Sequence, residues 1–355
     1  MEFDSHIADV VQKQAKTNDE TGELSPEVLD YIYKHRLFKL FLPPELGGTM
    51  TPLPEALRIF AESAYIDGDF GWLITIGSGG GYFAANLSRE TSAAIFSADN
   101  AVIAGSGQPT GKAVKTDGGY YVTGNWRYCS GSLHATTFTA NCVIEDKTGK
   151  DDGKIRAVAM TPDQVTIIKD WNAFGLKGTA SHTIAVENVF VPEERTFDID
   201  EKISFEDEPI YRFPFLPFAQ ASFAAVLVGL ARRFLEEAKK LVEKRAAGWD
   251  VIEGRSDFVR RRIAAAEKAF EAKAGEFAEV MAEKWKKHIE EGLQQEDEKE
   301  ISAVCIETAA AARGAANDVF PCLGMEVIKE GNLLLSIWKD IQTAAQHLLL
   351  APLFK

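Results

Sequence analysis

A block of short, strand-like runs flanked on both sides by helical sequence is the feature that most limits how this chain can fold. Between 99 and 205, runs such as GGYYVTGNWRYCSG and HTIAVENVFVP are rich in Val, Ile, Thr and aromatic residues, and Gly, Asp and Pro separate them. No helix of convincing length lies between these runs. An antiparallel sheet or barrel is therefore favoured over a parallel, doubly wound sheet.

Helical sequence precedes and follows this block. Ser25 can cap a helix that starts at Pro26, because Ser is a common N-cap and Pro is favoured at the first helical position. From about 215 onward, apolar residues recur every three or four positions between Arg, Glu and Lys. The stretch at 333–354 predicts a final helix, and the charge run at 283–300 is interpreted as a solvated helix end and turn. We therefore predict an α+β chain with an N-terminal helical domain over 1–98, a middle β domain over 99–205 and a C-terminal helical bundle over 206–355.

The glycine-rich stretch TIGSGGGYF at 75–83 looks like the start of a dinucleotide-binding loop. That fingerprint needs a preceding strand and a glycine in its sixth position, where this chain has Tyr82. The stretch also lies in the region predicted to be helical, so no sheet is available to carry such a loop. We exclude the dinucleotide interpretation and expect the small residues to allow close helix packing.

Charge and cysteine content narrow the possible partners. The chain has 53 acidic and 39 basic side chains and a formal net charge of −14, which disfavours nucleic acid and membrane surfaces. Four widely spaced cysteines form no CxxC pair, so the sequence suggests neither a metal site nor a disulfide framework. No targeting segment or long apolar run is evident, and we expect a cytoplasmic protein.

Four stretches resemble segments of the acyl-CoA dehydrogenase superfamily. They are FLPPELGG at 41–48, GGYYVTGNWRYCSG at 118–131, NAFGLKGTASHTIAVENVFVPEERTF at 172–197 and WKDIQTAAQH at 338–347. The resemblance implies an N-terminal α domain, a middle antiparallel β-barrel domain and a C-terminal four-helix bundle. It also implies a homo-oligomer, a dimer or more typically a homotetramer.

The departures from the dehydrogenase pattern point to one branch of that superfamily. Dehydrogenases of this type place a glutamate base eight residues after the Asp that matches Asp340, and here that position is Leu348. His347 precedes it, and the superfamily's flavin-dependent hydroxylases carry a catalytic histidine in this helix. The stretch AGSGQPTGKA at 104–113 also resembles the hydroxylase form. The likeness therefore implies a flavin-dependent monooxygenase that uses reduced flavin and O₂ on a small aromatic or heteroatom substrate.

The same resemblance assigns roles to individual residues. His347 would be the general base on a phenol-like substrate, because imidazole changes charge near neutral pH. Ser130 would be the polar group at the reactive edge of the flavin. The positions implied to contact the cofactor are Gly107, Gln108, Tyr128, Cys129, Ser130, Lys177 and Thr179.

The type of flavin stays open at this point. Family members that bind FAD reach the neighbouring subunit's adenylate through two segments, which correspond here to 244–250 and 317–327. The second has lost its double glycine to Cys322-Leu323-Gly324, and side chains there would narrow the approach of a ligand. We expect FMN, FAD or a freely exchanging reduced flavin, which a separate flavin reductase would supply.

Other interpretations of the same residues compete with these. One is an acyl-CoA dehydrogenase that uses FAD and a base elsewhere, such as Glu253. Another is a non-catalytic member without flavin, in which His347 is a packing residue and Ser130 satisfies a turn. Two indoles, Trp126 and Trp171, are core residues or line the flavin pocket, and Cys129 is a small buried residue.

Two histidines of the β block, His134 and His182, receive less weight than His347. We interpret both as surface residues. They are therefore not assigned a role in the chemistry.

Overall fold

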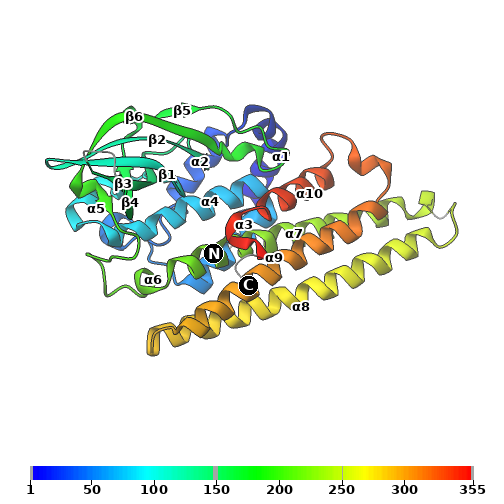
Figure 1. Ribbon diagram of the computed structural model, residues 1–355. Coiled ribbons are helices and arrows are strands. Elements are labelled where there is room, and N and C mark those ends of the chain that lie inside the picture. Colours follow the sequence, from blue (N-terminus) through cyan, green and yellow to red (C-terminus); the bar gives the residue numbers. More distant parts are fainter. Residues whose placement is uncertain (1–2, 147–150, 250, 353–355) are drawn as a thin grey trace.

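The computed structural model describes residues 3–146, 151–249 and 251–352. Along the chain, one helical block precedes the sheet and a second helical block follows it (Figure 1). The first block contains α1 (Ser5–Thr21), α2 (Pro26–Lys34), α3 (Leu53–Ile66), α4 (Gly68–Gly80) and α5 (Arg89–Phe96). Ser25 caps α2 by accepting the amide of Val28, and Pro26 is its first residue, which confirms that prediction.

The glycine-rich stretch is helical, as expected. It forms the end of α4 and continues into the 3₁₀ turn Gly81–Asn86. A Cβ atom at Gly77 would lie 2.3 Å from the ring of Phe38, so a side chain at this position would collide with the neighbouring segment. The small residues allow close packing, and the dinucleotide interpretation is correctly excluded.

Seven strands form the middle sheet in the order β5-β6-β2-β1-β3-β4-β7. The strands are β1 (Ile103–Thr116), β2 (Gly119–Cys129), β3 (Thr137–Glu145), β4 (Asp151–Met160), β5 (Thr166–Ile168), β6 (His182–Pro192) and β7 (Thr196–Phe197). A core of its own, centred on the fully buried Trp126, stabilises the sheet.

The middle β region is confirmed, but the sheet is mixed and not wholly antiparallel. Strands β1 and β3 pair in parallel, with Ile103 opposite Thr137. The reason is the path of the chain: β2 runs back to the start of β1, and the chain enters β3 there. The amides of Thr136 and Thr137 bond to the carbonyl oxygen of Val102 and fix this entry point.

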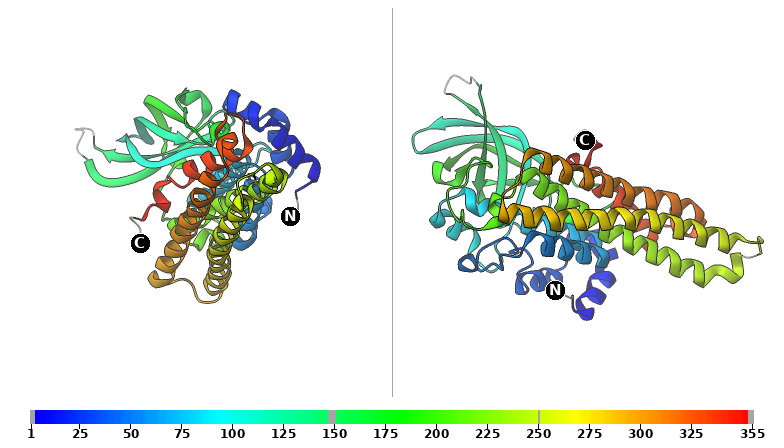
Figure 2. Two further views of the ribbon diagram at one scale, coloured as in Figure 1. Left: turned by 90° about the vertical axis from the view of Figure 1, so that its right-hand side faces the viewer. Right: turned by 90° about the horizontal axis from the view of Figure 1, so that it is seen from below.

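The second helical block is built around one long buried helix, α7 (Phe215–Trp249). It packs against α3, α4, α8 (Arg255–Glu290), α9 (Gln295–Val319) and α10 (Leu333–Ala344), while the short α6 (Pro209–Arg212) precedes it. A Cβ at Gly229 would lie 2.0 Å from the Ala61 carbonyl oxygen, so only glycine permits this contact of α7 with α3. Figure 2 shows the long helices extending away from the sheet.

By length and composition α7 would also be able to cross a membrane, yet 83% of its most apolar window is buried inside the protein. A buried core helix passes the same test, so this is weak grounds for a membrane span. The strands begin at Ile103 and end at Phe197. The domain borders at 98 and 205 stay a prediction.

Two details of the second block differ from the sequence-based expectations. The last helix ends at Ala344, and His347 begins a separate 3₁₀ turn, Leu348–Leu350, by accepting the Leu349 amide with its side chain. The expected helix over 333–354 is therefore too long, and its last two residues lie outside the described ranges.

The charge run at 283–300 is also not simply solvated. Lys284, His288 and Asp297 within it are buried. Lys284 and Lys287 pair with the Asp297 carboxylate, and His288 bonds to the Pro209 carbonyl oxygen. A charged residue can be buried where it has such a partner.

Candidate functional site

Ser130 and His347, which are far apart in the sequence, are brought to the same indole ring. Trp72 of α4 donates its Nε1 hydrogen to Ser130 Oγ at 3.0 Å. The His347 ring lies 6.0 Å from the Trp72 ring, measured between centroids. Trp72 thus joins the end of β2 to the segment that follows α10.

One side of the site is a chain of buried hydroxyl groups. Ser130 Oγ lies 2.7 Å from Ser181 Oγ, which lies 2.7 Å from Thr179 Oγ1. Thr179 donates to the Leu176 carbonyl oxygen at 2.8 Å. Each hydroxyl has one proton, so Thr179 accepts from Ser181 and Ser181 accepts from Ser130. In this arrangement the Ser130 proton is directed to Ser181, and Ser130 receives the Trp72 N–H.

The other side of the site consists of rings. Phe223 of α7 stacks on Trp72 with a centroid separation of 5.2 Å and an interplanar angle of 16°. It also lies 4.2 Å from the His347 ring. We call Phe223, Trp72 and His347 the ring wall, and Ser130, Ser181 and Thr179 the hydroxyl wall.

His347 is a neutral ring in this environment. Burial lowers the pKa of its imidazole from 6.5 to about 4. Nδ1 accepts the Leu349 amide at 3.3 Å, so the proton of the neutral ring is on Nε2. His347 therefore presents a donor at Nε2 as long as this hydrogen bond is made.

The residues implied to contact a cofactor lie where the sheet is irregular. The pairing of β1 with β3 changes register between Ser106 and Gly111, a span that contains Gly107 and Gln108. Both residues are exposed. Such irregularities often lie beside functional sites.

Strand β2 is irregular at its end. Its pairing with β6 shifts between Trp126 and Cys129, and Tyr128 within this span is 54% exposed with a positive φ of 67°. Cys129 is buried, and burial raises the pKa of its thiol to about 12, so it stays protonated. The interpretation of Cys129 as a small buried residue is confirmed.

The stretch GLKGT divides between two environments. Thr179 belongs to the hydroxyl wall, whereas Lys177 lies near the carboxyl groups of Asp19 and Asp340. Two non-glycine residues beside this stretch, Leu176 and Ala180, have positive φ angles of 50° and 46°. These strained conformations are uncommon and often occur at functional positions.

Sequence reasoning missed Trp72 and did not link Phe223 to the site. Trp72 lies 58 residues from Ser130, and no local pattern could pair them. Phe223 belongs to the periodic apolar face of α7, which gave no sign that this ring faces a histidine. Only the packing of α4, α7 and β2 reveals the cluster.

The remaining aromatic and histidine candidates have structural positions. Trp126 is in the core of the sheet, and Trp171 donates its Nε1 hydrogen to the Leu176 carbonyl oxygen at 2.8 Å. The surface interpretation of His182 is wrong, because this residue is buried and its Nδ1 accepts the Trp171 amide. His134 is half-buried and stacks on Phe38, so it is not a surface residue either.

The described residues of the two segments implied to bind an adenylate, 244–249 and 317–327, lie side by side at the end of the bundle far from the sheet (Figure 1). A Cβ at Gly324 would lie 3.0 Å from the Arg255 side chain. The turn after α9 therefore lies close to the start of α8. Arg245 and Gly248 lie in the last turns of α7. Glu253, the alternative base, is exposed and follows the end of α7 at Trp249, 30 residues after Phe223.

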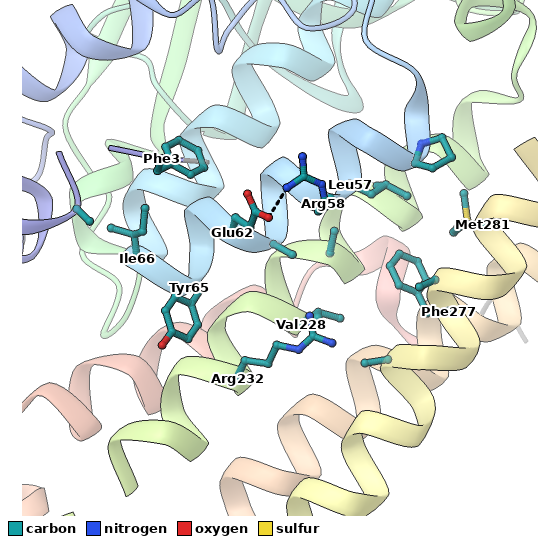
Figure 3. Close-up of a pocket in the computed structure, with 16 residues that line it drawn as sticks. Phe3, Leu57, Arg58, Glu62, Tyr65, Ile66, Val228, Arg232, Phe277 and Met281 are labelled. Carbon is teal, nitrogen blue, oxygen red and sulfur yellow. Dashed lines mark hydrogen bonds and ion pairs between the residues drawn. The ribbon is translucent and has the colours of Figure 1, made fainter. Parts of the chain in front are cut away.

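A separate cavity of about 810 Å³ lies between α3, α7 and α8 (Figure 3). Its lining includes Ala225, Val228 and Arg232, which project from the side of α7 opposite to Phe223. Arg232 is paired with Glu271, so its positive charge does not need a ligand as a partner. Within the described ranges, no group of three or more His, Cys, Asp or Glu side chains could hold a metal ion.

The residues at the site fit a flavin chemically. Both register shifts leave exposed backbone and side chains at the sheet surface, including the Gln108 amide and the Arg127 guanidinium. A Cβ at Gly107 would meet no atom within 4 Å, so this part of β1 is open to a planar ring. Amide and guanidinium groups suit the carbonyl oxygens and the phosphate of a flavin.

Comparison with known proteins agrees with this arrangement. A family model for the acyl-CoA dehydrogenase C-terminal domain matches residues 221–352. An indole-3-acetate monooxygenase of Pseudomonas putida is 30% identical over 242 residues, which are 67% of this chain and 61% of that protein. The flavin-dependent monooxygenase oxygenase subunit HsaA of Rhodococcus jostii is 24% identical over 95% of this chain and 91% of its own length.

A solved structure shows the same fold. The 3-HSA hydroxylase from Rhodococcus sp. RHA1 superimposes with a TM-score of 0.91 and 20% sequence identity, and the match covers 98% of this chain and 92% of that one. The helical blocks and the mixed sheet are therefore shared with that protein. Residues 221–352 belong to the acyl-CoA dehydrogenase C-terminal domain family, and the chain as a whole is similar to flavin-dependent monooxygenases in sequence and in fold.

Proposed function

We propose that this protein is the oxygenase component of a two-component flavin-dependent monooxygenase that acts on a small aromatic or heteroatom substrate. The observation that carries the proposal is the contact of Trp72 with both Ser130 and His347. It supports one site built from the two residues that the resemblance singled out. When bound, reduced flavin supplies the activation of O₂, and the protein supplies position and protons.

The ring wall suits a flat, apolar substrate. Trp72 and Phe223 are buried aromatic residues, and His347 adds one polar edge beside them. Aromatic faces bind another aromatic ring through offset or edge contacts. A substrate hydroxyl or ring N–H can then form a hydrogen bond with His347.

His347 exchanges a proton with the substrate in this proposal. Its lowered pKa keeps the ring neutral above about pH 5, so it is not already protonated at neutral pH. It becomes an acceptor at Nε2 only when the Leu349 bond to Nδ1 is released, because the proton can then move to Nδ1. The turn Leu348–Leu350 therefore controls whether His347 Nε2 can accept a proton.

Ser130 donates to the reacting oxygen only when the hydroxyl chain reverses. Thr179 then donates to Ser181, and Ser181 donates to Ser130, which frees the Ser130 proton. The Leu176 carbonyl oxygen keeps a partner, because Trp171 Nε1 also bonds to it at 2.8 Å. Reversal therefore leaves no buried acceptor unpaired, a state that would cost free energy.

Reduced flavin comes from a separate reductase in this proposal. Several relatives are named as oxygenase subunits or oxygenase components, which supports a system with a separate reductase. The changed segment at 322–324 supports FMN or an exchanging reduced flavin over tightly bound FAD. The protein itself is cytoplasmic in this proposal.

A homo-oligomer, a dimer or a tetramer, completes the proposal. Large apolar side chains are exposed at the far end of the bundle, including Val251 at 88% and Met325 at 76%. Exposed apolar surface of this kind is typical of an interaction site. Light scattering of the purified protein measures the assembly directly.

Turnover under ¹⁸O₂ tests the enzymatic proposal. NADH and a flavin reductase supply reduced FMN or FAD, with indole and p-hydroxyphenylacetate as probes. We expect one ¹⁸O atom in the product, detected by mass spectrometry, and a preference between the two flavins. Reduction of an artificial acceptor by an acyl-CoA, or failure of the protein to bind any flavin in a quenching titration, would overturn the proposal.

A further inference from the structure

The loop at 175–180 is held in place from two sides. It contains the 3₁₀ turn Lys177–Thr179 and lies between α4 and α10. Leu176 and Ala180, which flank this turn, both adopt left-handed backbone conformations. Such conformations persist only where surrounding contacts determine them. The contacts on this loop therefore indicate what fixes it.

Two carboxyl groups accept backbone hydrogens from this loop. Asp340 Oδ1 of α10 accepts the Leu176 amide at 2.6 Å. Asp69 Oδ2 of α4 accepts the Gly178 amide at 3.0 Å. Neither amide is left to water. The two helices thereby hold the loop at positions two residues apart.

Glycines let the loop and both helices come this close. A Cβ at Gly178 would lie 2.6 Å from Asp69 Oδ2, and one at Gly68 would lie 2.7 Å from Asp340 Oδ2. A Cβ at Gly175 would lie 2.3 Å from the Lys339 carbonyl oxygen. A side chain at Gly175 or Gly178 would push the loop away from a helix, and one at Gly68 would push α4 away from Asp340 of α10.

The carboxyl pair is placed where full ionisation is costly. Burial raises the pKa of Asp69 well above its usual range, and the neighbouring Asp67, Asp340 and Asp19 raise it further. Burial also raises the pKa of Asp340, against the lowering effect of Lys177. Asp69 Oδ1 has no hydrogen-bond partner among the described residues. The buried Asp297 of the bundle differs from this pair, because its carboxylate is bonded directly to two lysines.

Each helix that holds the loop also carries part of the site. Asp69 lies one turn before Trp72 on α4, and Asp340 lies in the helix that leads to His347. Thr179, which follows Gly178 in the loop, belongs to the hydroxyl wall. The loop therefore sets the position of the hydroxyl wall relative to the ring wall.

We propose that Asp69 and Asp340 are positioning residues that fix the loop at 175–180 between α4 and α10, and so align Ser130 with His347. This inference rests on the proposed function for its consequence in turnover. The hydrogen bonds that define it are independent of any bound flavin. The neutral amide of Asn can accept the same backbone hydrogens, so Asn should replace either residue and Ala should not.

Hydrogen exchange of the flavin-free, full-length protein tests the hold on the loop directly. We expect the peptide that spans 175–180 to exchange roughly tenfold faster in Asp340→Ala than in the parent, because a buried amide loses its acceptor. Asp340→Asn should keep the slow exchange. Asp297→Ala, which removes a buried carboxylate in the bundle, is the matched control and should leave this peptide unchanged. Asp340 carries the main test, because it is only half-buried and its substitution disturbs the fold less than substitution of the buried Asp69. Asp69→Ala and Asp69→Asn repeat the same comparison.

Turnover gives the second readout. With reduced FMN and indole, Asp340→Ala should lower kcat roughly 10- to 100-fold with a smaller change in KM, because a displacement of about 1 Å in a site can cost that much. Slow exchange of the loop in both Ala variants would overturn the inference, and so would faster exchange with unchanged kcat. If the parent oxygenates no aromatic probe, the proposed function fails, while the exchange data still decide whether the carboxyl groups hold the loop.

Discussion

The hydroxyl wall and the ring wall of the site are held by different forces. Ser130, Ser181 and Thr179 are buried and joined by directed hydrogen bonds of 2.7 Å. Phe223, Trp72 and His347 are joined by ring contacts of 4.2 to 6.0 Å between centroids. Hydrogen bonds fix distance and direction, whereas ring contacts tolerate sliding and tilting.

This difference suggests that the hydroxyl wall and the ring wall have separate functions. The hydroxyl wall is suited to hold a reacting oxygen at one place, and the ring wall can part to admit a substrate. Trp72 takes part in both, because its indole N–H bonds to Ser130 while its ring stacks on Phe223. Substitutions that alter one wall at a time separate the two contributions.

Loss of the imidazole should have the largest effect. We expect His347→Ala to lower turnover roughly 10²- to 10⁴-fold, the range for a positioned general base, and to leave flavin binding intact. Steady-state rates and a flavin titration measure the two quantities. His288→Ala is the control, because His288 is also buried but bonds to the Pro209 carbonyl oxygen in the bundle. Equal turnover in His347→Ala and the parent would remove His347 from the chemistry.

Loss of the hydroxyl at the end of the chain should rank second. Ser130→Ala should lower the yield of oxygenated product roughly 10²- to 10³-fold and raise the release of hydrogen peroxide, because one hydrogen bond to the reacting oxygen is lost. Ser63→Ala serves as the control: this buried serine donates to the Ile59 carbonyl oxygen within α3 and lies outside the hydroxyl chain. A product yield that is the same in both variants would count against the donor role.

Removal of the link between the walls should have a moderate effect. Trp72→Phe keeps a ring against Phe223 but deletes the donor to Ser130, so we expect roughly a 3- to 10-fold fall in kcat. Trp126→Phe deletes a comparable N–H, which bonds to the Asn141 carbonyl oxygen in the sheet core. This control should lower stability without changing kcat. An effect of Trp126→Phe alone on turnover would show that the hydrogen bond from Trp72 to Ser130 does not contribute to kcat.

Acid should act through the ring wall on the stability of the protein, and not on turnover at neutral pH. Unfolded His titrates near 6.5 and folded His347 near 4, so the unfolded state binds more protons between these values. Stability should therefore fall as the pH drops from about 6.5 to 4, by at most about 3 kcal/mol from this residue. Urea unfolding at several pH values should show a shallower fall in His347→Gln. Parallel curves for the two proteins would mean that His347 titrates normally.

Local sequence signals predicted much of the fold. The cap at Ser25, the helical state of the glycine-rich stretch and the central strands follow from short-range patterns. The parallel pairing of β1 with β3 depends on where the chain re-enters the sheet, which no local pattern specifies. The last helix was predicted too long because its apolar periodicity continues past the turn that His347 caps.

The site was only partly predictable for a related reason. Ser130 and His347 lie in motifs that resemble a known superfamily, so a sequence comparison can find them. Trp72 and Asp69 act through contacts with distant segments, and their own neighbourhoods show no special pattern. The implied role of Lys177 remains a prediction, since this side chain lies near Asp19 and Asp340.

A crystal structure of the protein with reduced FMN and indole, grown without oxygen, tests the central claim most directly. We predict that the flavin ring lies against the irregular part of β1 and the irregular end of β2 near Ser130, and that indole lies at the ring wall beside His347. In that complex the rings of Phe223 and His347 should be farther apart than the present 4.2 Å. Flavin or indole bound in the cavity between α3, α7 and α8, with both walls unchanged, would contradict the account.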